Sequence, residues 1–246
     1  VANVPNVADV AYFNTVPWNS IPFDDSDPVD AATIDALNAG YAPYNDGLDF
    51  MVSQSLLSQE EAEIRKIEFG NGNNGVVIFD KDLTDLTGFN PNLISMRQTK
   101  TADRITLPAA VVIGVDEGSG VVGLEVPMGD EYCLTEVEQG YIDERVDAFN
   151  AIINNKVSSN TSKLVRVDMN NVLSELYTNG ASINGAGMDA TLFPPFGGFS
   201  VDGIHPNQRC SGYIANKFIS AINLAFGSNI PELNPNNLPG NALPVP

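Results

Sequence analysis

The chain contains a single histidine, His205, and Asp202 stands three positions before it. On a tight loop, a carboxylate at this spacing can turn back and accept a hydrogen bond from the imidazole Nδ1–H. That bond fixes the tautomer and leaves Nε2 as a general base, the division of labour in a serine hydrolase triad. Gly203 permits unusual backbone angles in such a loop, and Pro206 prevents a helix from continuing through His205. The pair is therefore the first candidate for catalysis, and a purely structural loop contact is the alternative.

The sequence around this pair alternates between helical and extended patterns. After Thr135 and Glu138, which have capping-box spacing, apolar residues recur at helical intervals from Ile142 to Ile153. "KLVRVDM" then predicts a short buried strand, "NNVLSELYTNG" a helix, and "SGYIANKFISAINLAFG" a last helix after the His205 loop. This order of elements indicates a layered α/β domain with a mostly parallel sheet. Loops at the carboxyl ends of such strands are where ligands bind.

The rest of the chain is more heterogeneous. "VANVPNVADVAYF" predicts a buried strand over Val1 to Val4 and a loop, so residues 1–19 form one region, and we expect further polypeptide before it. Residues 20–133 predict an insertion or cap, with a helix beginning near Asp30 or Thr33. They also contain β-like runs at 75–80, 104–115 and 121–127, separated by glycine-rich turns. Residues 134–226 continue the α/β core, and residues 227–246 predict an extended surface tail rich in proline and asparagine.

The stretch "VDGIHPNQRCSGYIANKFISAIN" resembles the last block of the SGNH (GDSL-type) hydrolases, a family of esterases and lipases. "AFNAIINNKVSSNTSKLVRVDMNNVLSEL" and "VANVPNVADVAYF" are similar to two earlier segments of the family's second half. The resemblance covers about 1–19 and 134–226. It implies the C-terminal half of a three-layer α/β/α flavodoxin-like sandwich with a large mixed insertion in the middle. It also implies that Asp202 and His205 are catalytic, without a cofactor or a metal.

The family's other catalytic blocks have no counterpart here. No G-D-S-L-like nucleophile block and no G-x-N-D block occur in the chain, and the glycine-rich stretches around Gly70 and Ser119 predict turns instead. A triad without its serine cannot form an acyl-enzyme. We therefore expect the nucleophile and the oxyanion donors upstream of Val1. The N-terminal portion of the same protein, either continuous or as a separate chain, is thus a partner, and this chain alone is expected to be inactive.

The substrate expected from the resemblance is a small-molecule or lipid carboxylic ester. "TLFPPFGGFS" leads directly into Asp202, so Phe193, Phe196 and Phe199 are candidates for the wall of an acyl pocket. Their packing in a core beneath the loop is the alternative. A different class of function is also open, because a chain without a nucleophile could be a non-catalytic binding or scaffolding module that retains the fold.

The amino-acid composition limits the classes of function and the locations that remain open. The chain has 31 acidic and 12 basic residues, a formal net charge of −19, which disfavours binding to nucleic acid. No apolar run is long enough for a transmembrane helix. The acidity and the few cysteines suit an extracellular or cell-envelope bacterial protein.

Metal chemistry is disfavoured, because one histidine and two cysteines cannot supply the usual ligands of catalytic zinc. The acidic clusters at 24–30 and 80–85 lack the complete calcium-loop pattern and predict solvated loops and caps, with an opportunistic cation as the alternative. Cys133 and Cys210 are expected to be buried thiols, and a disulfide stays open if the compartment is oxidising.

Overall fold

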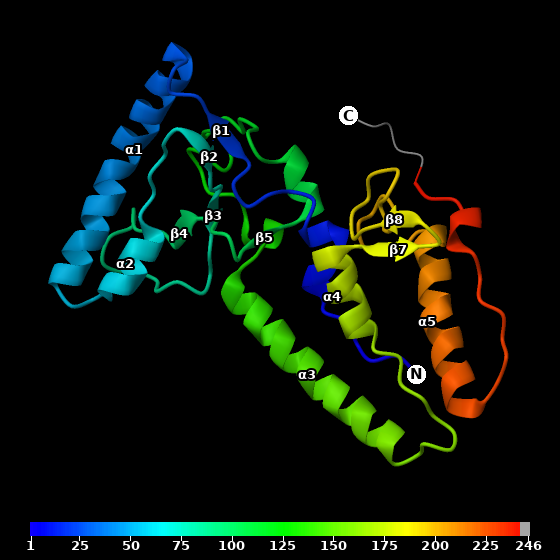
Figure 1. The fold of residues 1–246 in the computed structure, drawn as a ribbon. Coiled ribbons are helices and arrows are strands. Elements are labelled where there is room, and N and C mark those ends of the chain that lie inside the picture. The colour runs from blue at the N-terminus through cyan, green and yellow to red at the C-terminus, as the bar shows by residue number, and fades with distance from the viewer. Residues whose placement is uncertain (242–246) are drawn as a thin grey trace. The chain divides into compact units, whose positions relative to one another are not determined.

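A computed structural model describes residues 1–241 (Figure 1). It is a mixed α/β protein, with five α-helices and short antiparallel strand pairs in the described residues. The chain divides into two compact units, one made of Val1–Thr15 and Glu138–Pro246 and the other of Val16–Val137. We call the first the split unit, because its two segments are far apart in sequence, and the second the inserted unit. The sequence places the corresponding boundaries at 19/20 and 133/134, and the structure divides the chain at 15/16 and 137/138.

The inserted unit is built from two helices and three strand pairs. Its longest helix, α1 (Pro28–Ser53), begins a few residues before the predicted start, because Asp27 accepts a hydrogen bond from the Val29 N–H and Pro28 occupies the first turn. The other elements are α2 (Gln59–Arg65) and the antiparallel pairs β1 (Ile21–Phe23) with β2 (Gly72–Asn74), β3 (Val77–Phe79) with β4 (Met96–Gln98), and β5 (Arg104–Ile105) with β6 (Cys133–Leu134).

The inserted unit contains the large hydrophobic core of the protein. One face of α1 is buried at intervals of three and four residues, from Leu37 to Met51, and packs with the apolar side chains of β3, such as Ile78. Every member of the buried apolar cluster lies in this unit.

Two of the β-like runs predicted in this unit are largely wrong. Only Arg104–Ile105 of the run 104–115 is a strand, and the chain then forms a 3-10 helix over Leu107–Val111. The run 121–127 is a tight turn, with Gly123 at φ +83° and its N–H bonded to the Val126 carbonyl. An apolar run by itself does not distinguish a strand from a buried turn. In the run 121–127, Gly123 with its positive φ favours the turn.

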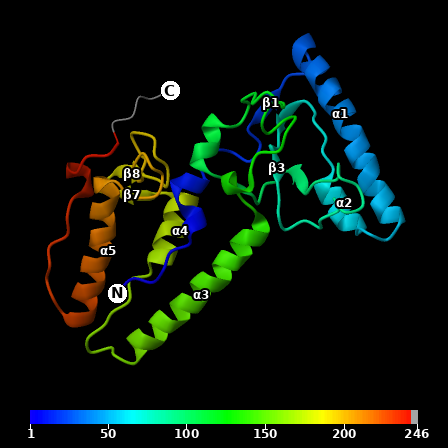
Figure 2. The same cartoon turned by 180° about the vertical axis from the view of Figure 1, so that it is seen from behind.

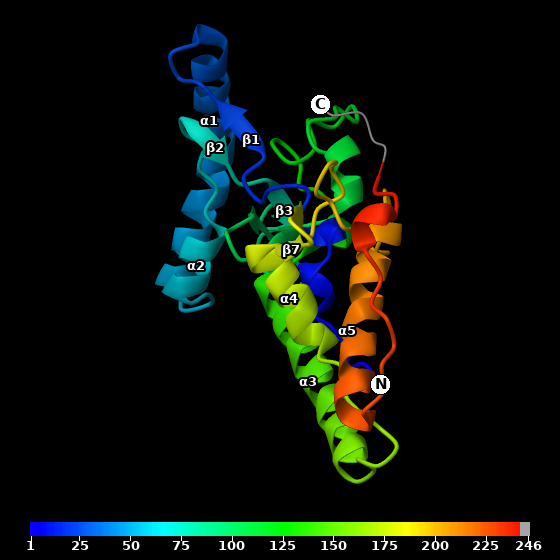
Figure 3. The same cartoon turned by 45° about the vertical axis from the view of Figure 1, so that its right-hand side comes forward.

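Within the described residues, the split unit contains three α-helices and one hairpin, seen from behind in Figure 2 and after a turn of 45° in Figure 3. Its helices are α3 (Glu136–Ser158, of which the first two residues cluster with the inserted unit), α4 (Met169–Asn179) and α5 (Gln208–Phe226). The hairpin pairs β7 (Ala181–Ile183) with β8 (Ala186–Met188). The three helices predicted from the apolar periodicity are confirmed.

The buried strand predicted over Val1 to Val4 is only partly present. Ala2 forms an isolated parallel bridge with Val167, and Val1 is half exposed. The predicted strand "KLVRVDM" is reduced to the same bridge. No flavodoxin-like sheet is formed by the described residues, because this ladder has two members and each strand pair of the chain stands separately.

The predicted surface tail folds back along α5. Asn216 exchanges hydrogen bonds with the backbone of Leu233, and Asn223 does the same with Ile230. Further along, Asn236 donates to the Ile183 carbonyl and Asn241 to the carbonyls of Leu192 and Phe199, so the tail is tied to the rest of the split unit. The last five residues of the predicted tail, 242–246, lie outside the described residues.

The two cysteines are buried thiols without a disulfide between them. Burial raises the pKa of the Cys210 thiol to about 12, so it is a packing residue and not a reactive one. No helix in residues 1–241 is both long and apolar enough to cross a membrane.

Candidate active site

The loop that carries Asp202 and His205 is a closed turn just before α5. Phe199 and Pro206 form an antiparallel bridge at its base, and the Ser200 N–H donates to the His205 carbonyl at 2.7 Å. Inside the turn, the Gly203 N–H donates to the Ser200 carbonyl at 2.9 Å. The turn therefore returns the chain on itself within six residues and presents both side chains on its outer side.

Asp202 and His205 make the contact that their spacing predicts. The distance from Asp202 Oδ2 to His205 Nδ1 is 2.7 Å. The other carboxylate oxygen, Oδ1, accepts from the Ser200 hydroxyl at 2.6 Å and from the backbone N–H groups of Ile204 and His205 at 2.9 and 3.0 Å. The carboxylate is thus held by four donors and has one orientation.

The donors also fix the charge of the carboxylate. Hydrogen bonds from the Ser200 hydroxyl, the His205 ring and the backbone hold the pKa of Asp202 well below its usual range. An ionised carboxylate only accepts hydrogen bonds, so Nδ1 must carry the proton of their shared bond. In the neutral ring, Nε2 then has the free lone pair and can act as a base.

The imidazole is accessible. Its side chain is 78% exposed, and no hydrogen bond to Nε2 is formed by the described residues. The hydroxyl of Ser200 is engaged by Asp202 on the far side of the dyad, so it is not placed to be the nucleophile. Within residues 1–241, Nε2 of His205 is thus open to solvent and bonded to no hydroxyl.

Neighbouring elements position the loop on both sides. The Tyr12 N–H donates to the Gly203 carbonyl at 2.8 Å, which ties the loop to the N-terminal segment. After the loop, Asn207 caps α5 by accepting from the Cys210 N–H, and its Nδ2 donates to the buried Gly197 carbonyl at 2.8 Å. The backbone around the dyad is therefore anchored to α5 and to residues 11–12.

The geometry of this loop requires a glycine at position 203. Its φ is +72°, and a Cβ placed there would lie 2.8 Å from the backbone nitrogen of Tyr12. We expect Gly203→Ala to cost about 1–3 kcal/mol in the free energy of unfolding, because it combines a strained backbone with a clash that no side-chain rotation relieves. Urea denaturation measures this change in the free energy of unfolding. Gly185→Ala is the matched control, since Gly185 also has a positive φ but open space around its Cβ position.

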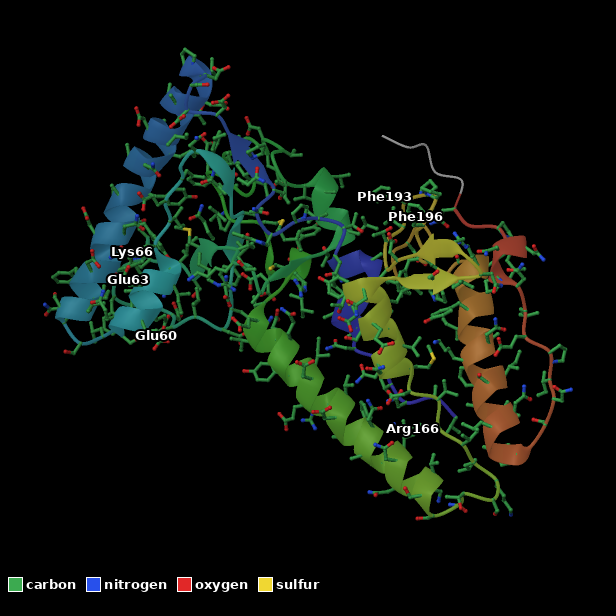
Figure 4. All side chains as sticks on the ribbon, viewed as in Figure 1. Glu60, Glu63, Lys66, Arg166, Phe193 and Phe196 are labelled. Carbon is green, nitrogen blue, oxygen red and sulfur yellow. The ribbon has the colours of Figure 1, made fainter. Side chains whose placement is uncertain are left out.

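The three phenylalanines predicted as an acyl-pocket wall do not come together at one site. Phe199 is buried and lines an apolar cavity, whereas Phe193 and Phe196 are about half exposed on the loop after β8 and line two other surface depressions (Figure 4). Phe193 and Phe196 thus line surface depressions apart from the cavity that Phe199 lines, and a role of the three in an acyl pocket stays a prediction.

The cavity beside Phe199 has a volume of about 160 Å³ and an almost entirely apolar lining. Ile204 and Pro206, the two residues that flank His205, form part of its wall. The rest comes from the N-terminal segment, α4 and α5, and includes Val10, Val172, Leu176 and Ile214. The α4 residues were not predicted as site residues, although their helical spacing marks them as one apolar face.

The other candidate stretches have structural roles. In the cluster 80–85, Asp80 is buried and pairs with Arg97, and Asp85 accepts from Thr87. In the cluster 24–30, Asp24 accepts from Ser26 and Asp27 caps α1. The glycine-rich stretch 70–75 includes β2 and a turn held by the side chain of Asn74. Within residues 1–241 no group of three or more histidine, cysteine, aspartate and glutamate side chains could hold a metal ion.

Comparisons of the chain with protein-family models, with curated proteins and with solved structures gave no match. The geometry of the dyad defines the class of site: an oriented, ionised carboxylate holding an accessible imidazole. Such a pair can accept a proton from a hydroxyl, and within residues 1–241 no hydroxyl is bonded to Nε2.

Proposed function

We propose that this chain is the C-terminal part of an SGNH-type serine hydrolase that cleaves carboxylic esters. His205 is the general base, and Asp202 orients it and stabilises the imidazolium that forms. The serine nucleophile and the oxyanion donors are supplied by polypeptide upstream of Val1. The observation that carries the proposal is the 2.7 Å bond between Asp202 Oδ2 and His205 Nδ1, with the ring exposed.

The arrangement of the split unit supports the same fold. The bridge between Ala2 and Val167 is parallel, and the chain between them returns through α3, as in a strand–helix–strand unit. We propose that this ladder belongs to the sheet of a three-layer α/β/α sandwich and that the inserted unit is an insertion between its two strands. The His205 loop then lies in the region where such sheets bind ligands.

The apolar cavity supports the choice of substrate class. It is lined by Phe199 and by the two residues that flank His205, Ile204 and Pro206, so an ester with an apolar acyl group suits this part of the chain. Phe199 is the one predicted acyl-pocket residue that this proposal retains.

The test is ester hydrolysis by the protein expressed with the residues that precede Val1 in its gene. The probes are p-nitrophenyl acetate, butyrate and octanoate, followed by the release of p-nitrophenolate. We expect turnover by the longer protein, labelling of its serine by a fluorophosphonate probe, and neither from residues 1–246 alone. A longer protein that neither turns over these esters nor is labelled would contradict the hydrolase proposal and would favour the binding-module alternative.

A further inference from the structure

The turn that carries the dyad, residues 199–206, is closed at its base by the bridge between Phe199 and Pro206. We call these residues the dyad turn. In this kind of antiparallel pair the neighbouring residues form the hydrogen bonds, so the N–H and C=O of Phe199 point away from Pro206. The Phe199 N–H donates to the Thr191 carbonyl at 3.0 Å. Because Phe199 is 3% exposed, its carbonyl needs a donor from another part of the chain.

The C-terminal tail supplies that donor. The side-chain amide of Asn241 donates to the carbonyls of Leu192 and Phe199, and Leu192 is 6% exposed. An amide nitrogen carries two N–H donors, so one side chain satisfies both carbonyls. Within residues 1–241 no other donor is bonded to either of them. Without Asn241, two buried acceptors at the entry to the dyad turn would be left unpaired.

The tail is held in this place by close packing on α5. The 3-10 helix Pro235–Asn237 contacts α5, and Pro235 is buried. Gly212 stands inside α5, where glycine is less favourable than alanine. A Cβ at Gly212 would lie 2.6 Å from Leu238 Cδ1 and 3.6 Å from Pro235 Cα. The glycine thus lets the tail approach the helix closely, a few residues before Asn241.

A second contact of the tail reaches the segment that leads into the dyad turn. Arg209, in the first turn of α5, donates from Nη2 to Asn236 Oδ1 at 2.9 Å and to the Gly187 carbonyl at 3.0 Å. Its Nη1 donates to the Pro195 carbonyl at 3.0 Å. The tail, α5, the β7–β8 hairpin and the segment before Phe199 are therefore joined by hydrogen bonds between residues far apart in sequence.

These contacts bear on where the dyad lies. The bonds within the dyad turn fix its two functional side chains relative to each other, but not relative to the rest of the protein. That position depends on the anchors of the turn: the Tyr12 N–H at the Gly203 carbonyl, Asn207 at the start of α5, and the backbone of Phe199 at the base. A displacement of about 1 Å caused by a distant mutation can lower a rate by about 100-fold.

We infer that Asn241 is a positioning residue for the dyad: it holds the base of the dyad turn through the Phe199 carbonyl and so fixes where the turn presents Asp202 and His205. The inference deepens the proposed function, on which it rests for the reaction that the dyad performs. It acts through the backbone of Phe199 and not by contact with the imidazole. It also gives a role to the tail, whose composition predicts only an extended surface segment.

The first part of the test is amide hydrogen exchange in residues 1–246. Asn241→Leu keeps the size of the side chain and removes both N–H donors without adding charge. We expect the amides of the dyad turn to exchange at least about 10-fold faster in this variant, because the unpaired carbonyls favour local opening. The amides of α1 should be unaffected. Asn237→Leu is the matched control, since Asn237 is exposed on the same tail and its side chain forms no hydrogen bond within the described residues.

The second part is kinetic and uses the protein that includes the residues preceding Val1. We expect Asn241→Leu to lower kcat for p-nitrophenyl butyrate by about 10-fold or more, with KM changed by less than about 2-fold, and Asn237→Leu to change neither. Equal exchange in the two variants, or faster exchange in Asn241→Leu with an unchanged kcat, would overturn the inference. If no esterase activity is found at all, the proposed function fails, and the exchange rates still decide whether Asn241 holds the dyad turn.

Discussion

Replacing His205 by alanine is expected to lower kcat/KM for p-nitrophenyl butyrate by about 10⁴-fold or more in the protein that includes the residues preceding Val1. The ring is the only imidazole in the chain, and its Nε2 is the one accessible base that the dyad leaves free. Because the ring is 78% exposed, its removal leaves no cavity, so Tm should stay within about 2 °C of the wild type. Activity would thus be lost without loss of the fold.

The Asp202→Asn variant tests how Asp202 orients the His205 ring, separately from proton transfer by the ring itself. The amide cannot be ionised and favours the wrong tautomer of the ring, so we expect a loss of up to about 10⁴-fold in kcat with a smaller effect on KM. Asp189→Asn is the matched control, because Asp189 also accepts from a hydroxyl and an N–H two residues away but contacts no histidine. Unchanged turnover in both His205→Ala and Asp202→Asn would exclude the dyad as the catalytic base.

The geometry of the dyad was predictable because it is local. Two residues three positions apart, with a glycine between them, can reach each other whatever the rest of the fold does. The same holds for α3, α4 and α5, because the apolar periodicity that predicts each helix lies in neighbouring residues. The role of Ser200 was missed, although a serine two residues before an aspartate is a common local partner for its carboxylate.

What could not be predicted depends on contacts between distant residues. The separation of Phe193 and Phe196 from Phe199 follows from how their loop folds against the hairpin and α5, which no pattern in "TLFPPFGGFS" specifies. The predictions of strands were inaccurate for a related reason. A strand is completed by its partner, and in the split unit only one partner of Ala2 is present among the described residues. The predicted strands over Val1 to Val4 and in "KLVRVDM" are therefore reduced to the single bridge between Ala2 and Val167.

The inserted unit contains a second long-range feature with a large expected effect. Arg97 is buried between Asp80 and Asp103, with its Nε 2.6 Å from Asp80 and its two terminal nitrogens 2.6 and 2.9 Å from the oxygens of Asp103. All three residues are less than 7% exposed. Removing one partner from such a cluster leaves uncompensated buried charge, and here it would leave two carboxylates facing each other.

We therefore expect Arg97→Met to destabilise the inserted unit by about 3–5 kcal/mol. Trp18 is the only tryptophan of the chain and lies in this unit, so its fluorescence during urea denaturation reports the unfolding of this unit specifically. Lys81→Met is the control: Lys81 pairs with Asp130 at 2.7 Å, but their side chains are 50% and 30% exposed, and the expected cost is below about 1 kcal/mol.

A third variant separates charge from packing as the cause. If buried charge is responsible, combining Arg97→Met with Asp80→Asn and Asp103→Asn should recover part of the lost stability, because no ion is then left unpaired in the interior. If the loss came from poor packing of methionine, the added asparagines would recover nothing. A single variant Arg97→Met as stable as Lys81→Met would show that water reaches the two carboxylates, and that the cluster does not stabilise the inserted unit.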